Sequence, residues 1–305
     1  MNAGLSTRAY SDSIDKMSMQ KRLFLVGCSR SGTTLLQSLI AAHPNVVSFP
    51  ESHFFVRLHS TRCWMNEIGL ASRKAREVME AYFQKIGAWK TYQAHSSPIM
   101  VRPQSLSKAF VNTFDDLARE RGGGCWLEKT PRHVRYLPEI EDNVPNYHVI
   151  HLLRQGEATV ASLYHAQNAY PEKWGGAATI EECCRRWKHD VTISLRYHGR
   201  SNHTVVTYDG LVTETEPTLQ RVVGDVGLEY DSAMTEGYGA VSDEVVDSDE
   251  EWKEGIKRDI EHRQLKKFRK VFDPHQQERV SDQVHSLNAA IRAIETIGNH
   301  PPHHL

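Results

Sequence analysis

Short apolar runs alternate along the chain with stretches of helical spacing. The run KRLFLVG (21–27) predicts a buried strand, and the helix predicted after it carries Leu35, Leu36, Leu39 and Ile40 on one face. Four further segments predict strands: NVVSF (45–49), CWLEK (125–129), YHVIHLL (147–153) and HTVVTY (203–208). Helical patterns lie between them, and this alternation predicts an α/β fold with a central parallel sheet.

The region between the second and third predicted strands has few strand signals. We expect residues 52–121 to form a mainly helical insertion, either as a lid over an acceptor or as helices packed on the sheet. Since no linker rich in Pro, Gly or Ser interrupts the pattern, we predict a single domain over 21–297. Residues 1–20 and 298–305 are expected to be flexible ends.

Composition excludes several classes of protein. The 305 residues carry 37 Lys and Arg against 38 Asp and Glu, so no basic field favours nucleic acid as a partner. No apolar run approaches the roughly 20 residues of a membrane span, and the N-terminus lacks a secretory signal, so a cytoplasmic protein is expected. The 17 histidines form no ligand spacing, so no metal site is expected. Five cysteines without a C-x-x-C spacing predict reduced thiols: Cys28, Cys63, Cys125, Cys183 and Cys184.

A glycine-bracketed loop follows the first predicted strand. Gly27 and Gly32 enclose four residues before a helix, a pattern typical of a backbone N–H nest that binds phosphate or a close analogue. Thr33 stands where an ATPase loop has lysine, so the positive charge must come from elsewhere, and Arg30 within the loop can supply it. The candidate anion-binding residues are Gly27, Cys28, Ser29, Arg30, Ser31, Gly32, Thr33 and Thr34.

Three ordered segments resemble the sulfotransferases that use 3′-phosphoadenosine 5′-phosphosulfate (PAPS). VGCSRSGTTLLQSLIAAHPNV resembles the loop that binds the 5′-phosphosulfate, and HLLRQGEATVASLY supplies the strand ending in Arg154 and the helix carrying Ser162. VVTYDGLVTETEPTLQRVVGDVGLEYD is similar to a third family segment, whose tyrosine corresponds to Tyr208. The resemblance spans about residues 21–230. It implies a three-layer α/β/α, P-loop-containing nucleoside triphosphate hydrolase-like fold and PAPS as co-substrate. It also implies that Arg154 and Ser162 hold the 3′-phosphate while Tyr208 borders the nucleotide.

The run RSGTT…HPNVVSFPES is most similar to the branch that contains tyrosylprotein sulfotransferases and many bacterial sulfotransferases. That resemblance implies that Glu51, 21 positions after Arg30, is the general base, and that Lys129 in LEKTP binds the transferred sulfate. The chemistry fits these residue types, because a loose in-line transfer needs cations to neutralise the leaving charge and a base for the acceptor proton. Two alternatives stay open: Glu51 as a carboxylate that stabilises a helix N-terminus, and His53 as a competing base.

The chain departs from the soluble small-molecule branch, because it lacks the C-terminal R-K-G cluster that binds the 3′-phosphate. Lys253 and Lys257 are the candidate replacements, with ordinary helix-surface lysines as the alternative. A P-loop kinase or ATPase with a degenerate loop would need a lysine at position 33 and an acidic residue at a strand end for Mg²⁺. A non-catalytic nucleotide-binding protein is the other alternative.

We therefore expect a sulfotransferase that moves a sulfuryl group from PAPS to a hydroxyl or amine and leaves adenosine 3′,5′-bisphosphate (PAP). The acceptor, whether small molecule, carbohydrate or peptide, and the oligomeric state stay open.

Overall fold

A five-stranded parallel sheet forms the centre of the protein. The computed structural model describes residues 19–58, 70–236 and 260–298, with side chains in the last segment described over 266–295. The strands are β1 (Lys21–Gly27), β2 (Val46–Phe49), β3 (Cys125–Lys129), β4 (Tyr147–Leu153) and β5 (His203–Thr207). Their order is β2-β3-β1-β4-β5, and every neighbouring pair is parallel. Because β1 lies between β3 and β4, the loop that follows β1 meets the carboxyl ends of both neighbours.

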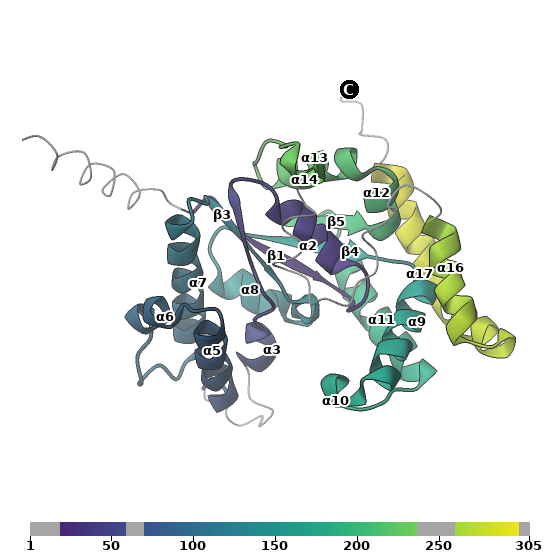
Figure 1. Cartoon of the computed structure of the whole chain (residues 1–305), viewed down its shortest axis with the longest axis horizontal. Helices are drawn as coiled ribbons and strands as arrows, with labels where there is room; N and C mark the ends of the chain where they lie inside the picture. The colour runs from purple at the N-terminus through teal and green to yellow at the C-terminus, as the bar shows by residue number, and fades with distance from the viewer. Residues whose placement is uncertain (1–18, 59–69, 237–259, 299–305) are drawn as a thin grey trace, which may run out of the picture.

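Helices cover both faces of this sheet and give the predicted three-layer α/β/α fold (Figure 1). The first half of the chain supplies α2 (Thr33–Ala41), α3 (Phe54–Leu58), α5 (Arg73–Lys85), α6 (Trp89–His95), α7 (Pro103–Glu120), the 3-10 helix η1 (Pro131–Tyr136) and α8 (Leu137–Asn143). The second half supplies α9 (Gly156–Ala169), α10 (Pro171–Trp174), α11 (Ile180–Arg196), α12 (Tyr208–Thr213), α13 (Thr215–Asp225), α14 (Ala233–Glu236), α16 (Ile260–Val271) and α17 (Pro274–Gly298).

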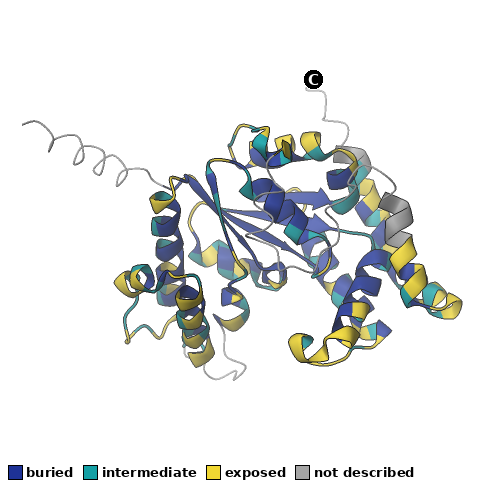
Figure 2. Ribbon diagram, in the orientation of Figure 1, coloured by how far each residue is buried: buried dark blue, intermediate teal, exposed yellow. Residues whose placement is uncertain are grey.

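Side-chain alternation along β1 separates the two faces of the sheet. Leu23 and Leu25 point into a core that α2 and α13 complete, while Phe24 and Val26 point into a second core on the opposite face. Figure 2 shows the sheet buried along its length, with exposed residues on the outer sides of the helices. The strand is thus buried on both faces, which is why its sequence reads as a continuous apolar run.

The predicted helical insertion contributes an aromatic core to the Phe24 face. Phe54 and Phe110 stack with their ring centroids 4.5 Å apart, and Phe114 lies edge-on to Trp126 of β3 at 5.2 Å. Within the described residues, the helices of 52–121 therefore pack on the sheet, as one of the two alternatives predicts. Whether they also act as a lid stays a prediction.

A buried ion pair fastens α7 to the sheet. Asp115 accepts from Arg22 Nη2 at 2.6 Å and Nε at 3.0 Å, and from Trp126 Nε1 at 2.8 Å. The carboxylate is thereby hydrogen-bonded on both oxygens, which offsets the cost of burying it.

The last predicted strand is one residue too long. β5 ends at Thr207, whose hydroxyl accepts from Gly210 N at 3.2 Å and caps α12, so Tyr208 begins a helix instead of ending the strand.

None of the helices in the described ranges is long and apolar enough to span a membrane. Cys63 lies outside those ranges, and the other four cysteines are buried thiols.

Candidate active site

The loop between β1 and α2 (residues 27–34) curls over the carboxyl end of β1. Gly27 has a φ of 153° and Gly32 a φ of 98°, both in the region that favours glycine. A Cβ on Gly27 would lie 2.5 Å from the carbonyl oxygen of Leu152, and one on Gly32 would lie 2.5 Å from the ring of Tyr208. Both glycines are therefore required by close neighbours as well as by backbone conformation.

One buried hydroxyl of the loop bonds to the loop's own backbone. The Ser31 hydroxyl donates to the carbonyl oxygen of Cys28 at 2.6 Å, and both Ser31 and Thr33 are buried. Burial raises the pKa of the Cys28 thiol well above its usual value, and nearby Asp190 adds to the rise. The thiol is thus protonated and unreactive at neutral pH, and it adds no negative charge to the loop.

On the β4 side of the loop, two arginines each contact another candidate nucleotide-binding residue. The Arg154 guanidinium lies over the Tyr208 ring, with 4.0 Å between its Cζ and the ring centroid. Arg30 has a φ of 71°, and its Nε donates to the Ser162 hydroxyl at 3.3 Å. The structure therefore places Arg30, Arg154, Ser162 and Tyr208 along one edge of the loop. The contact between Arg30 and Ser162 is one the sequence did not predict.

On the β3 side, a lysine joins the loop to the candidate base. Lys129 Nζ lies 2.6 Å from Glu51 Oε1 and 3.5 Å from the Thr34 hydroxyl. The lysine side chain is 9% exposed and that of Glu51 34%, so the Glu51 side chain is the one that solvent reaches. These three residues come from the end of β3, the segment after β2 and the start of α2.

His53 stands beside this pair. Its Nε2 lies 3.6 Å from Glu51 Oε2, and its φ of 53° is unusual for a residue with a side chain. Burial lowers the pKa of His53, although the charge of Glu51 opposes that effect. His53 is therefore neutral near pH 7, and it stays an alternative base by geometry.

A fully buried carboxylate holds the segment that carries Glu51 and His53. Glu128 Oε1 accepts from Ser52 N at 2.9 Å, from the Ser52 hydroxyl at 2.8 Å and from the Thr130 hydroxyl at 2.5 Å. Its Oε2 lies 3.1 Å from His133 Nδ1. His133 Nε2 accepts from the backbone N–H of Phe55 at 3.2 Å, so the ring proton lies on Nδ1 and faces the carboxylate.

These interactions keep Glu128 ionised. Burial alone would raise its pKa, but His133 and the hydrogen bonds from Thr130 and Ser52 lower it to about 2. No sequence motif marks Glu128 as a candidate site residue. The feature that could have indicated it is a charged residue, Glu128, within a strand whose other residues predict burial.

Comparison with known proteins identifies the family. The model of the sulfotransferase family matches residues 22–232, more than two thirds of the chain. The chain belongs to the sulfotransferase family. This confirms the predicted class of enzyme and the resemblance on which the prediction rested.

Relatives and solved structures agree on the fold of this sulfotransferase. It is 25% identical over 238 residues to the nodulation protein NoeE of Sinorhizobium fredii, covering 69% of this chain and 50% of that protein. The sulfotransferase domain of the Synechococcus PCC 7002 olefin synthase matches with a TM-score of 0.59 at 19% identity, covering 89% of this chain and 94% of that domain. Mouse sulfotransferase SULT7A1, solved in complex with PAP, matches with a TM-score of 0.50 at 13% identity, covering 92% of each chain.

The predicted site residues of the sulfotransferase thus fall into two groups around loop 27–34. Arg154, Ser162 and Tyr208 lie on the β4 side, and Glu51 and Lys129 lie on the β3 side. Lys253 and Lys257 lie outside the described residues, so their predicted role at the 3′-phosphate stays a prediction. Among the described residues, no cluster of His, Cys, Asp or Glu has the geometry of a metal site.

Proposed function

We propose that this sulfotransferase takes its sulfuryl group from PAPS and passes it to an acceptor hydroxyl, or alternatively to an amine, with PAP as the second product. The observation that carries this proposal is the position of Lys129. Its ammonium lies within 3.5 Å of the Thr34 hydroxyl in loop 27–34 and within 2.6 Å of the Glu51 carboxylate. One cation thereby connects the anion-binding loop with the candidate base.

The residues present fit a nucleotide with an added 3′-phosphate. Loop 27–34 leads directly into α2, and the backbone N–H groups and the helix dipole at the start of this helix favour negative charge. Arg154 and Ser162 supply a fork-shaped cation and a hydroxyl donor on the β4 side, and the Tyr208 ring offers an apolar border. PAPS, when bound, supplies an activated sulfuryl group whose leaving group is the 5′-phosphate of PAP.

Each residue then has a defined task. We assign the removal of the acceptor proton to Glu51, whose side chain is partly exposed to solvent. As the acceptor oxygen bonds to sulfur, the sulfur–oxygen bond to the 5′-phosphate breaks. Lys129 and the loop N–H groups stabilise the negative charge that collects on the leaving phosphate. Arg30, bonded to Ser162, neutralises charge on the nucleotide from the other side.

A kinase or ATPase is disfavoured by the same geometry. Such an enzyme needs a carboxylate near the end of β4 or β3 to hold Mg²⁺. β4 ends next to Arg154, whose guanidinium covers Tyr208, and the carboxylate of Glu128 on β3 is enclosed by Ser52, Thr130 and His133. Neither position presents a free carboxylate to a metal–nucleotide complex.

Calorimetric titration tests the donor. The protein should bind PAP and show weaker or no binding of ATP with Mg²⁺. Arg154→Ala should weaken PAP binding by roughly tenfold or more, because it removes a charge-assisted contact to phosphate. Lys74→Ala on the exposed side of α5 is the matched control and should leave PAP affinity unchanged. A preference for ATP would refute the proposal.

Transfer of labelled sulfate from PAPS to a panel of hydroxyl compounds tests the base. Glu51→Gln should lose at least a hundredfold in kcat while keeping PAP affinity, as expected for the loss of a general base. His53→Gln is the paired variant. If His53→Gln lost the larger share of kcat and Glu51→Gln turned over normally, the assignment would pass to His53.

The cytoplasmic location remains our proposal, and cell fractionation tests it.

A further inference from the structure

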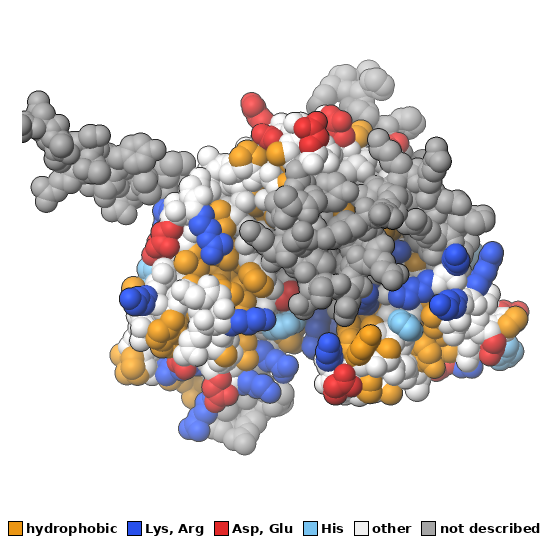
Figure 3. All heavy atoms as spheres, in the orientation of Figure 1, with side chains coloured by type: hydrophobic (Ala, Val, Ile, Leu, Met, Phe, Trp, Pro, Cys, Tyr) orange, Lys and Arg blue, Asp and Glu red, His pale blue; other side chains and the backbone are white. Residues whose placement is uncertain are grey.

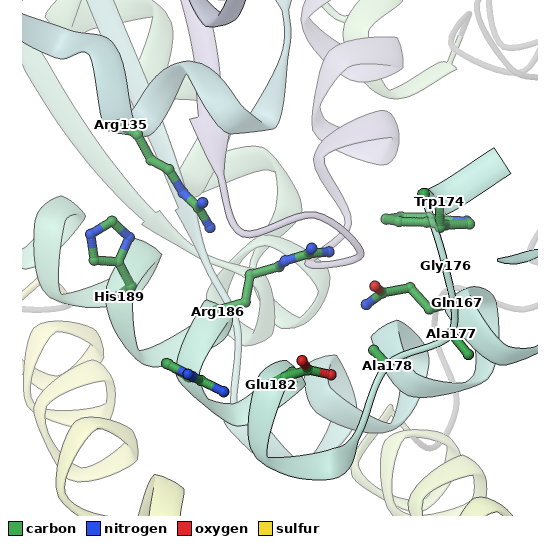
Figure 4. A pocket seen from close by; sticks show the side chains of 11 residues that line it. Arg135, Gln167, Trp174, Gly176, Ala177, Ala178, Glu182, Arg186 and His189 are labelled. Atoms are coloured by element: carbon green, nitrogen blue, oxygen red, sulfur yellow. The ribbon is translucent and has the colours of Figure 1, made fainter. Parts of the chain in front are cut away.

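A cleft of about 510 Å³ contains Arg186, whose side chain lies beside the loop that follows β1 (Figure 4). Its lining comes from η1, α9, α10, the segment 175–178 and α11 (Figure 4). η1 begins two residues after Lys129, and the cleft residue Gln167 lies on the same helix as Ser162. The cleft is therefore built from the helix that follows β3 and from the helices that follow β4.

Arginine dominates the charge of this cleft. Arg135, Arg185, Arg186 and His189 line it, against the single lining carboxylate of Glu182. Figure 3 shows Lys and Arg side chains gathered around the hollow at the lower edge of the molecule, between α5 and α10. The volume lies within the range of about 300–1,000 Å³ usual for small-molecule sites.

Within the described residues, two of these arginines make no ion pair. Arg135 donates to Asp190 at 2.6 Å, so its charge is compensated. Glu182 is engaged in a capping box with Thr179 at the start of α11. In the portion of the chain that the structure describes, neither Arg185 nor Arg186 forms an ion pair. Three arginines against Glu182 and Asp190 leave a surplus of one positive charge in or under the cleft, before His189 is counted.

Arg186 points toward loop 27–34. Figure 4 shows its guanidinium extending under the loop that follows β1. Its charge also acts on the Cys28 thiol in that loop, which it stabilises in the ionised form against the larger effect of burial. The half-buried guanidinium therefore lies between loop 27–34 and the open cleft.

An aromatic side chain forms the opposite wall. Trp174 ends α10, packs partly against the core of α9 and α11, and is half-buried. Gly175 and Gly176 follow it with φ of 77° and 123°. The small side chains of Ala177 and Ala178 line the cleft beside them. Figure 4 shows the Trp174 ring across the cleft from Arg186. An indole face beside a guanidinium suits a ligand with an aromatic ring and an attached negative group.

We propose that this cleft binds the acceptor, and that the acceptor is a phenol or related aromatic alcohol bearing an anionic group. Arg186, assisted by Arg185, binds the carboxylate, phosphate or sulfate of the acceptor, and Trp174 packs on its ring. This inference rests on the proposed function, because it names the substrate class of that same site. The surplus positive charge also disfavours cationic acceptors of the same size.

Three phenols of matched size and different charge test this inference. They are 4-hydroxyphenylacetate, its neutral amide 4-hydroxyphenylacetamide, and the cation tyramine. With labelled PAPS, kcat/KM should fall in that order, by roughly tenfold between the anion and the neutral amide. Calorimetric titration of each phenol into PAP-saturated protein should give the same order of affinity.

Variants on α11 assign the preference to a residue. Arg186→Gln should bring the ratio of kcat/KM for the anion and the amide toward one, and Arg186→Glu should reverse the preference in favour of tyramine. Arg196→Gln, exposed on the last turn of the same helix, is the matched control and should keep the wild-type ratio.

The outcomes separate this inference from the proposed function. If the protein does not bind PAP, the proposed function fails. If it binds PAP but shows no preference for the anion, binds none of the three phenols, or keeps its preference in Arg186→Gln, the acceptor inference is overturned while the donor assignment stands.

Discussion

Replacing the buried Glu128 by glutamine tests whether one carboxylate positions the segment that carries the candidate base. Glutamine keeps the shape of the side chain but removes its charge. It also turns an N–H donor toward groups that are themselves donors: the Ser52 N–H and the Thr130 hydroxyl around one oxygen, and His133 Nδ1–H beside the other. At least one donor in this enclosed cluster would then lack an acceptor.

The pKa of Glu128 gives the expected size of the effect. It is lowered from 4.5 to about 2, and one pKa unit corresponds to about 1.4 kcal/mol, so the ionised carboxylate contributes about 3 kcal/mol to the free energy of unfolding at pH 7. For a chain of this size, that loss should lower Tm by about 5 °C. Because the folded pKa lies below the unfolded one, the contribution is complete above about pH 5. It declines as the pH falls from there toward 2.

Two assays check this reasoning together. Urea unfolding at pH 7 and pH 4 should show a smaller difference between wild type and Glu128→Gln at the lower pH. Transfer of labelled sulfate should fall in kcat more than PAP affinity falls, because Ser52 lies between Glu51 and His53 and loses its anchor. Glu77→Gln, exposed on α5, is the matched control. An unchanged Tm in Glu128→Gln would show that the cluster contributes nothing to the fold.

Two further predictions follow from close contacts and from buried histidine. Gly32→Ala should weaken PAP binding and lower Tm, because its Cβ would lie 2.5 Å from the Tyr208 ring. Gly224→Ala on α13 has open space around its Cβ and should leave both unchanged or raise Tm slightly. Burial lowers the pKa of His151 from 6.5 to about 3, so below about pH 6.5 the unfolded chain takes up a proton that the folded chain does not. Between pH 7.5 and 5.5 the free energy of unfolding should therefore fall by about 1.4 kcal/mol more in wild type than in His151→Gln, measured by urea unfolding. Equal pH slopes in the two proteins would contradict this account.

Local sequence was sufficient for the strands and for the loop. YHVIHLL predicts β4 to the residue, because a strand buried on both faces reads as an uninterrupted apolar run. Gly27 and Gly32 mark the turn, because only glycine tolerates both the backbone angle and the neighbouring atoms. The predicted end of β5 is one residue too late, because Gly210 N–H donates to the Thr207 hydroxyl and so begins a helix at Tyr208.

Contacts between side chains of distant segments could not be predicted from local sequence. The candidate residues Arg30 and Ser162 were both named from motifs, yet their mutual contact depends on how β1 and β4 lie side by side. The Glu128 cluster joins residues 52, 128, 130 and 133, and a single buried glutamate in the sequence does not say which donors surround it. The cleft cannot be predicted from local sequence either, because Arg135, Trp174 and Arg186 belong to three separate helices.

The order of strands and helices, the anion-binding loop and the family follow from the amino-acid sequence, because each is read from short segments whose residues are neighbours in the chain. The tertiary structure decided which side chains face one another. Parallel strands bring their carboxyl ends to one edge of the sheet, and the strand order β2-β3-β1-β4-β5 then sets Lys129 on one side of the loop and Arg154 on the other. That order is a property of long-range packing, and so are the pairing of Lys129 with Glu51 and the arginine cleft beside them.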